Sequence, residues 1–180
     1  MIDIKNLTKD ELKVTYKKLA KEIGDDSFFT KKELNYLPEI FLDRELLICF
    51  CSGLMNGNTW LITLTNKRII FLDKGMLVGL KQQSINLDKI NSISVTTGLI
   101  FGEIFIENAA GSSTIKQIQK NAAKSFVSSA QKVIDSLNNK LEINNNSPFE
   151  IIEKLAQLRD KGLITEDEFL DKKSKLLEQI

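Results

Sequence analysis

The sequence contains no histidine, and it contains only two cysteines and two prolines. Without histidine the chain lacks the commonest general base and the commonest metal ligand of proteins. Cys49 and Cys51 are two residues apart, a spacing that places both on one face of a strand and fits a disulfide poorly. We therefore interpret them as buried small hydrophobic residues in a reducing compartment, and we expect no metal site and no cofactor.

An excess of charge of one sign and a long apolar run are also missing. The 25 basic and 24 acidic residues give a net charge of +1, so only a local patch could attract nucleic acid or anionic lipid. No apolar run approaches the roughly 20 residues that span a bilayer. The first residues, MIDIKNLTKDELK, lack the continuous apolar segment of a secretory signal. We therefore expect a cytoplasmic protein without a transmembrane segment.

The apolar residues that are present concentrate in residues 59–72, which read TWLITLTNKRIIFL. β-Branched, aromatic and leucine residues favour strands. Because Asn66-Lys67 is the only polar pair between two apolar runs, the stretch predicts a β-hairpin with its tip there. Turn residues separate further predicted strands at 46–52, 77–86, 90–96, 101–107 and 113–118, and 53–58 is interpreted as a loop. Seven short strands predict an antiparallel sandwich or small barrel.

Helices are predicted on both sides of this region. Thr8 and Glu11 fit a capping box, and apolar residues at helical spacing predict a helix over 9–23 that ends near Gly24. A shorter helix over 31–36 is expected to stop before Pro38, because the residue preceding proline resists helical angles. A wide apolar stripe over 121–137 predicts a helix that closes the open end of the sheet.

The C-terminal part is punctuated by clear helix signals. Residues 138–147, NNKLEINNNS, are polar and predict a flexible linker. Ser147-Pro148 predicts a helix start, Gly162 a helix end, and Thr165 with Glu168 a second capping box. The result is a helical hairpin of roughly 33 residues. Chains shorter than about 40 residues usually need additional stabilisation, such as association with another surface, in order to fold.

Two short helices cannot hide both of their apolar stripes from water by themselves. The hairpin is therefore expected to pack on the sheet domain, on a copy of itself or on a partner protein, and self-association is the most economical of these. The candidate oligomer interface consists of Ile151, Ile152, Leu155, Leu158, Phe169, Leu176 and Leu177.

Two groups of basic residues are candidate contacts for an anion. The first is a helix face with one lysine every four residues: Lys9, Lys13, Lys17 and Lys21. The second lies at and after the hairpin tip, and it is a candidate contact for an anion or an acidic peptide: Lys67, Arg68, Lys74 and Lys81. Both groups also fit an ordinary solvated surface.

No catalytic residue is predicted. The cysteines have no histidine to activate them, and no serine lies in a nucleophile-elbow pattern. The glycine pairs Gly53…Gly57 and Gly98…Gly102 lack the Lys-Ser/Thr pair or helix start of a phosphate-binding loop. We therefore expect that the chain is not an enzyme.

Two parts of the sequence resemble known families. Residues 34–137 resemble the bacterial pleckstrin-homology-like (PH-like) domain of the YokE type, chiefly through LTNKRIIF at 64–71 and INLDKINSI at 85–93. Residues 148–180 resemble the SHOCT (short C-terminal) domain through KGLITEDEF at 161–169.

The resemblance implies an α+β fold, in which a PH-like, seven-stranded, antiparallel bent barrel is capped by a C-terminal helix. We expect an N-terminal helical extension at 1–40, the barrel with its capping helix at 41–138, a flexible linker at 139–147 and a separate helical hairpin at 148–180. The resemblance implies no established catalytic activity. It also implies that the chain assembles into oligomers. Eukaryotic relatives often bind inositol phosphates through basic residues of the first loop, but residues 52–58 contain no lysine or arginine.

Two functional hypotheses follow. The first is a non-enzymatic cytoplasmic scaffold, in which the barrel binds a protein or peptide and the hairpin drives homo-oligomerisation. The alternative is a peripheral binder of anionic lipid or nucleic acid that uses the lysine face of the first helix together with Lys67 and Arg68.

Overall fold

The computed structural model describes residues 1–25, 30–75, 79–145 and 148–178, with side chains described for all of these except 140–148. The chain divides into two compact units, Met1–Ile134 and Asp135–Ile180.

The first unit is built on seven strands. In chain order they are β1 (Leu47–Met55), β2 (Asn58–Thr65), β3 (Arg68–Lys74), β4 (Leu80–Asn86), β5 (Ile90–Thr97), β6 (Phe101–Asn108) and β7 (Gly111–Gln119), with a short 3₁₀ turn η2 (Leu87–Lys89) before β5. The pairing is antiparallel in the order β4-β3-β2-β1-β7-β6-β5. The strands β1 and β7 join where Leu54 pairs with Lys116. The expected seven-stranded antiparallel α+β fold is confirmed, including the hairpin tip at Asn66-Lys67.

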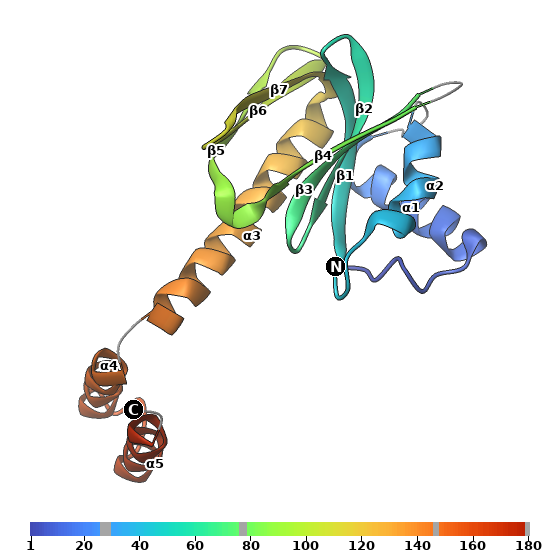
Figure 1. Cartoon of the computed structure of the whole chain (residues 1–180). Coiled ribbons are helices and arrows are strands. Elements are labelled where there is room, and N and C mark those ends of the chain that lie inside the picture. Colours follow the sequence, from blue (N-terminus) through green and yellow to red (C-terminus); the bar gives the residue numbers. More distant parts are fainter. Residues whose placement is uncertain (26–29, 76–78, 146–147, 179–180) are drawn as a thin grey trace. The chain divides into compact units, whose positions relative to one another are not determined.

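The long helix α3 (Lys120–Asn145) follows the last strand and caps the sheet, as expected (Figure 1). Its buried residues follow one face: Ala122, Ala123, Phe126, Val127 and Ala130. The helix continues beyond the predicted end at Leu137, so the predicted linker is helical as far as Asn145. Asparagine is a weak helix former, but it costs less than 1 kcal/mol per residue, so a helix that has already formed can continue through it. Residues 146–147, with the predicted Ser147 cap, lie outside the described residues.

Two α-helices precede the sheet in the described part of the chain. The helix α1 (Lys9–Ile23) has the predicted bounds, the Thr8–Glu11 capping box and a left-handed Gly24 at its end (φ 83°). The helix α2 (Lys31–Ile40) continues through Pro38, so the predicted stop before this proline was wrong. The proline lies in the last turn, where burial of Leu34 and Leu37 holds the segment against the sheet.

These two helices cover the face of β1–β3 that lies opposite α3 (Figure 1). Their buried residues form one cluster with strand residues: Leu12, Tyr16, Leu19, Ala20, Leu34 and Leu37 from the helices and Leu47, Phe50, Leu61, Ile70 and Leu72 from the strands. Both faces of the central strands are therefore buried, which explains why residues 59–72 form a nearly continuous apolar run.

Gly53 lies at a close approach between β1 and β7. A Cβ atom at this position would lie 2.6 Å from Ile115 Cγ2 and 2.7 Å from Ile118 Cγ1. The interpretation of 53–58 as a loop was wrong, because β1 runs through Gly53 to Met55 and the turn follows at Asn56-Gly57. This glycine serves a tight contact between strands and not a turn.

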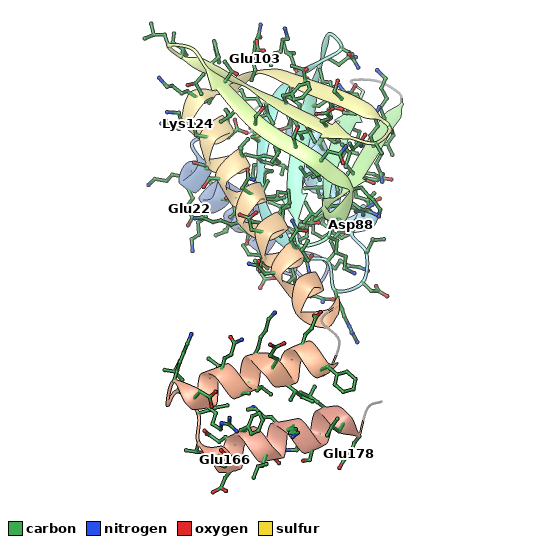
Figure 2. The ribbon with its side chains drawn as sticks, turned by 90° about the vertical axis from the view of Figure 1, so that its left-hand side faces the viewer. Glu22, Asp88, Glu103, Lys124, Glu166 and Glu178 are labelled. Carbon is green, nitrogen blue, oxygen red and sulfur yellow. The ribbon has the colours of Figure 1, made fainter. Side chains whose placement is uncertain are left out.

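The second unit contains a helical hairpin of α4 (Pro148–Asp160) and α5 (Glu166–Leu177). Gly162 adopts a left-handed conformation (φ 70°), and the amide of Leu163 donates to the carbonyl of Leu158 over 2.9 Å. The predicted capping box of Thr165 and Glu168 is present. Figure 2 shows α4 and α5 side by side, with Glu166 and Glu178 at the two ends of α5.

We predict that Gly53→Ala lowers the free energy of unfolding by about 1–3 kcal/mol, because its Cβ atom would overlap the side chains of β7. The matched control is Gly98→Ala, whose Cβ atom would meet its nearest neighbour, the carbonyl oxygen of Phe101, at an ordinary 3.6 Å. Urea denaturation of the two variants measures the difference. Equal stabilities would contradict the close approach of β1 and β7.

Candidate functional site

The guanidinium group of Arg68 is directed inward at the base of the hairpin tip. Its Nε donates to Oε1 of Glu45 over 2.9 Å and its Nη2 donates to Oε2 over 3.0 Å. The same Nη2 donates to the carbonyl of Ile40, the last residue of α2, over 2.8 Å. Arg68 is buried, so its charge serves a contact inside the protein.

Glu45 is the acceptor at the centre of this arrangement. Besides Arg68, it accepts a hydrogen bond from the Thr65 hydroxyl over 2.8 Å and one from the amide of Leu42 over 2.7 Å. Burial raises the pKa of this carboxyl. The hydrogen bonds from Arg68, Leu42 and Thr65, together with the charge of Arg68, lower the pKa by more than burial raises it, so the pKa of Glu45 lies below its ordinary value. Glu45 is therefore an anion held by four donors.

The two residues of the tip bind the same neighbouring segment. Oδ1 of Asn66 accepts from the amide of Leu46 over 2.7 Å, and Nζ of Lys67 donates to the carbonyl of Asp43 over 2.7 Å. We call Glu45, Thr65, Asn66, Lys67 and Arg68 the hairpin clasp. The residues that carry the strongest sequence signature of the fold thus fasten the hairpin to the segment that links α2 to β1.

Lys74 and Lys81 lie at the opposite end of β3. Nζ of Lys74 lies 4.4 Å from the centre of the Tyr36 ring, and Nζ of Lys81 lies 3.5 Å from a carboxylate oxygen of Asp73. The seven residues of β3 span about 20 Å. The four predicted anion contacts therefore form two separate pairs, each residue has an internal partner, and their role in binding an anion stays a prediction.

The lysine face of α1 has a different setting, because it borders a groove of about 830 Å³ between α1 and α2. All four predicted residues, Lys9, Lys13, Lys17 and Lys21, line this groove and are exposed. Lys31 of α2 lines it from the other side, and Tyr16, Ala20 and Leu34 supply its apolar floor. We call this feature the lysine groove.

Within the described residues, none of the four α1 lysines forms an ion pair, whereas Lys18, away from the groove, lies 3.9 Å from Glu22. Tyr16 on the floor is buried, and its ring packs edge to face against Phe50 at a centroid distance of 6.0 Å. Its hydroxyl has no hydrogen-bond partner in the described part of the chain, and burial raises the pKa of this group. The groove thus combines unpaired positive charge with an apolar floor.

The C-terminal hairpin leaves much of its apolar surface exposed. Phe169 is buried, with the guanidinium carbon of Arg159 4.7 Å and Nζ of Lys173 5.8 Å from its ring centre. Of the other predicted interface residues, Ile151, Ile152, Leu155 and Leu176 are half-buried, and Leu158 and Leu177 are exposed. Three exposed residues were missing from that prediction: Phe149 (67%), Leu163 (68%) and Leu170 (51%). Phe149 and Leu163 lie beside helix ends, and Leu170 is next to the predicted interface residue Phe169. At such positions a sequence pattern does not distinguish buried from exposed apolar residues.

The turn between β5 and β6 exposes a second apolar feature, which the sequence reasoning missed. Leu99, Ile100 and Phe101 follow one another there, and Leu99 is 91% exposed. Three consecutive apolar residues after Gly98, at a predicted turn, were the available signal.

The two cysteines are free and buried. Burial raises the pKa of the Cys49 thiol to about 12, although a hydrogen bond with Ser129 of α3 lowers it in part. Burial also raises the pKa of Cys51 well above its ordinary value, with a further contribution from the charge of Asp25. Among the described residues there is no cluster of cysteine and acidic side chains suited to a metal ion, and no helix long and apolar enough to cross a membrane.

Two family models match two separate segments of the chain. The bacterial PH domain family matches residues 42–132, just over half of the chain, and the short C-terminal domain (SHOCT) matches residues 152–177. The chain is also similar to the crystal structure of a pleckstrin homology domain from Shewanella amazonensis SB2B, with 22% identity, 48% of this chain and 80% of that chain covered, and a TM-score of 0.36.

A second similar structure is that of a DUF1696 family protein with a pleckstrin-homology domain from Shewanella loihica PV-4. The identity is 21%, the alignment covers 67% of this chain and 94% of that chain, and the TM-score is 0.38. A search of curated proteins returned no match.

We predict that Glu45→Gln lowers the free energy of unfolding at pH 7 by about 3–5 kcal/mol, because it leaves the buried charge of Arg68 without its counterion. The lowered pKa of Glu45 means that its contribution is present above the ordinary carboxyl pKa and is lost as the pH falls through the folded-state value. Urea denaturation between pH 7 and pH 3 should therefore show a steeper loss of stability on acidification for the unmodified chain.

The control for this series is Glu39→Gln, which changes an exposed carboxylate of α2. It should stay within about 0.5 kcal/mol of the unmodified chain at pH 7. Equal stability of Glu45→Gln and Glu39→Gln would contradict the clasp.

We also predict that Cys49 and Cys51 do not react with a thiol reagent at pH 8 while the protein is folded, because their raised pKa values and their burial leave almost no accessible thiolate. Absorbance with Ellman's reagent should show both thiols only after addition of urea. The control Ser112→Cys places a third thiol at an exposed position and should react at once in the folded protein. If the unmodified protein, which lacks this third thiol, reacted rapidly with the reagent while folded, the burial of Cys49 and Cys51 would be contradicted.

Proposed function

The chain belongs to the bacterial PH domain family, and from this premise we propose that it is a binding and scaffold module that self-associates through its C-terminal hairpin. Its first unit would bind a protein or peptide, and the module would perform no reaction of its own. The observation that carries the proposal is the apolar surface that α4 and α5 leave exposed.

Leu170 and Leu177 support this proposal most directly. They are seven residues apart, so they lie on one face of α5, and they are 51% and 45% exposed. Covering a large apolar side chain contributes about 1.5–3 kcal/mol relative to full exposure. In a two-fold contact each residue is used twice, so pairing of the two copies would cover four partly exposed leucine side chains, which favours association.

The exposed turn of Leu99, Ile100 and Phe101 supports the second half of the proposal. Large apolar side chains that are contiguous on a surface are typical of protein–protein contacts. This turn belongs to the first unit, so it offers a contact surface that is distinct from the hairpin.

We predict that the full chain has at least twice the mass of a single chain at 100 µM, measured by light scattering after size-exclusion chromatography. Leu170→Gln with Leu177→Gln should shift it to the single-chain mass, because the exposed strip becomes polar while Phe169 stays in place. A chain that ends at Asn139 should also have the single-chain mass.

The matched control is Glu153→Gln with Lys172→Gln, which changes two exposed residues of the same hairpin without altering the net charge. It should keep the mass of the unmodified chain. If the full chain and the chain ending at Asn139 both have the single-chain mass, the proposed self-association is refuted.

A further inference from the structure

We propose that the lysine groove between α1 and α2 is a docking site for an acidic amphipathic helix of a partner protein. This site goes beyond self-association, because the described residues that line it belong to α1, α2 and Asp25 of the first unit and not to the C-terminal hairpin.

The charge of the groove indicates an acidic partner. One wall of the groove carries a lysine at every fourth residue of α1: Lys9, Lys13, Lys17 and Lys21. Successive lysines are about 6 Å apart along the helix axis, and the four span about 18 Å. A partner helix with glutamate or aspartate at every fourth position has the same repeat. Because these lysines have no ion-pair partner among the described residues, a ligand carboxylate would not have to displace an internal one.

The floor of the groove indicates an apolar stripe on the same partner. Tyr16, Ala20 and Leu34 lie between the lysine wall and α2, so a bound ligand would contact apolar carbon at the centre and ammonium groups at the edge. The recognition of a helix in a groove commonly has this form, with apolar anchors in the middle and charges along the rim.

The same geometry disfavours the two other anions that a lysine face could bind. A bilayer is flat on this scale, whereas the apolar part of the site lies at the bottom of a groove. Single-stranded nucleic acid usually stacks its bases on exposed aromatic rings, but the ring of Tyr16 is 95% buried and already packed against Phe50. A peptide helix meets both the charge and the shape.

Asp10 and Asp25 lie among the lining residues and limit the extent of the positive wall. Asp10 is in the first turn of α1 and Asp25 follows its end, so the uninterrupted positive stretch runs from Lys13 to Lys21. The bound helix is therefore expected to centre on Lys17, the middle lysine of this stretch.

The test uses the full chain and two capped 16-residue probe peptides labelled with a fluorophore. The first peptide is helical, with glutamate at every fourth position beside a stripe of leucines. The second has the same charge, but its leucines are replaced by glutamine. Fluorescence anisotropy at 150 mM salt should show binding of the leucine peptide at least tenfold tighter than that of the glutamine peptide.

Lys13→Gln with Lys17→Gln should weaken the leucine peptide at least tenfold, because these lysines border the floor of the groove. The control, Lys18→Gln, removes one exposed lysine of the same helix that pairs with Glu22 away from the groove. It should change the affinity less than twofold, and Lys17→Gln, which removes one charge at the groove, should weaken binding more than this control does. Circular dichroism of all variants should be unchanged, since the substituted side chains are exposed.

Three results would overturn the proposal: equal binding of the two peptides, an equal effect of Lys18→Gln and of the groove variant, or displacement of the leucine peptide by a 20-nucleotide single strand or by vesicles of phosphatidylcholine and phosphatidylglycerol. Each would show that charge alone governs binding at α1. A single-chain mass in light scattering would leave this result unaffected, so self-association and peptide docking are tested independently.

Discussion

The layers of the first unit follow from the burial of β1–β3 on both faces. A sheet with one apolar face needs one covering layer, but these strands are apolar on both and need two. The helix α3 covers one face, and α1 and α2 cover the other. Helices that begin before the family match at residue 42 are thus part of the core of the first unit, because Phe50, Leu61 and Ile70 would be exposed to water without them.

The hairpin clasp sets how these layers meet. The Glu45–Arg68 pair links the start of β3 to the segment after α2, and its guanidinium also donates to the last carbonyl of that helix. A buried ion pair gains little net stability, because desolvation of two charges offsets most of their attraction. We interpret its value here as geometric: four directional hydrogen bonds to Glu45 allow one position of the hairpin tip, whereas apolar contacts alone would allow several.

Sequence patterns predicted those parts of the fold that local chemistry determines. The capping boxes at Thr8 and Thr165 and the tip at Asn66-Lys67 depend on neighbouring residues, and all three are present. The clearest error occurred where distant residues decide the outcome. Gly53 has the composition of a turn, but it is required by Ile115 and Ile118, which follow more than 60 residues later. Buried Glu45 is indistinguishable in sequence from a surface acid. The sequence identified the basic residues of the candidate sites, but it did not show which groups these residues contact in the fold.

Those partners distinguish two sets of basic residues that look alike in the sequence. Lys67, Arg68, Lys74 and Lys81 each contact a group within the protein, so their charge is largely used in holding the fold. The lysines of α1 face a groove, and a helix that is held in place by its buried Leu12, Tyr16 and Leu19 presents them at a fixed spacing. Burial of one face of α1 in the core thus fixes the position of the lysines that border the groove. Recognition through this groove would accordingly be a property of the N-terminal extension, which lies outside the part of the chain that matches the family.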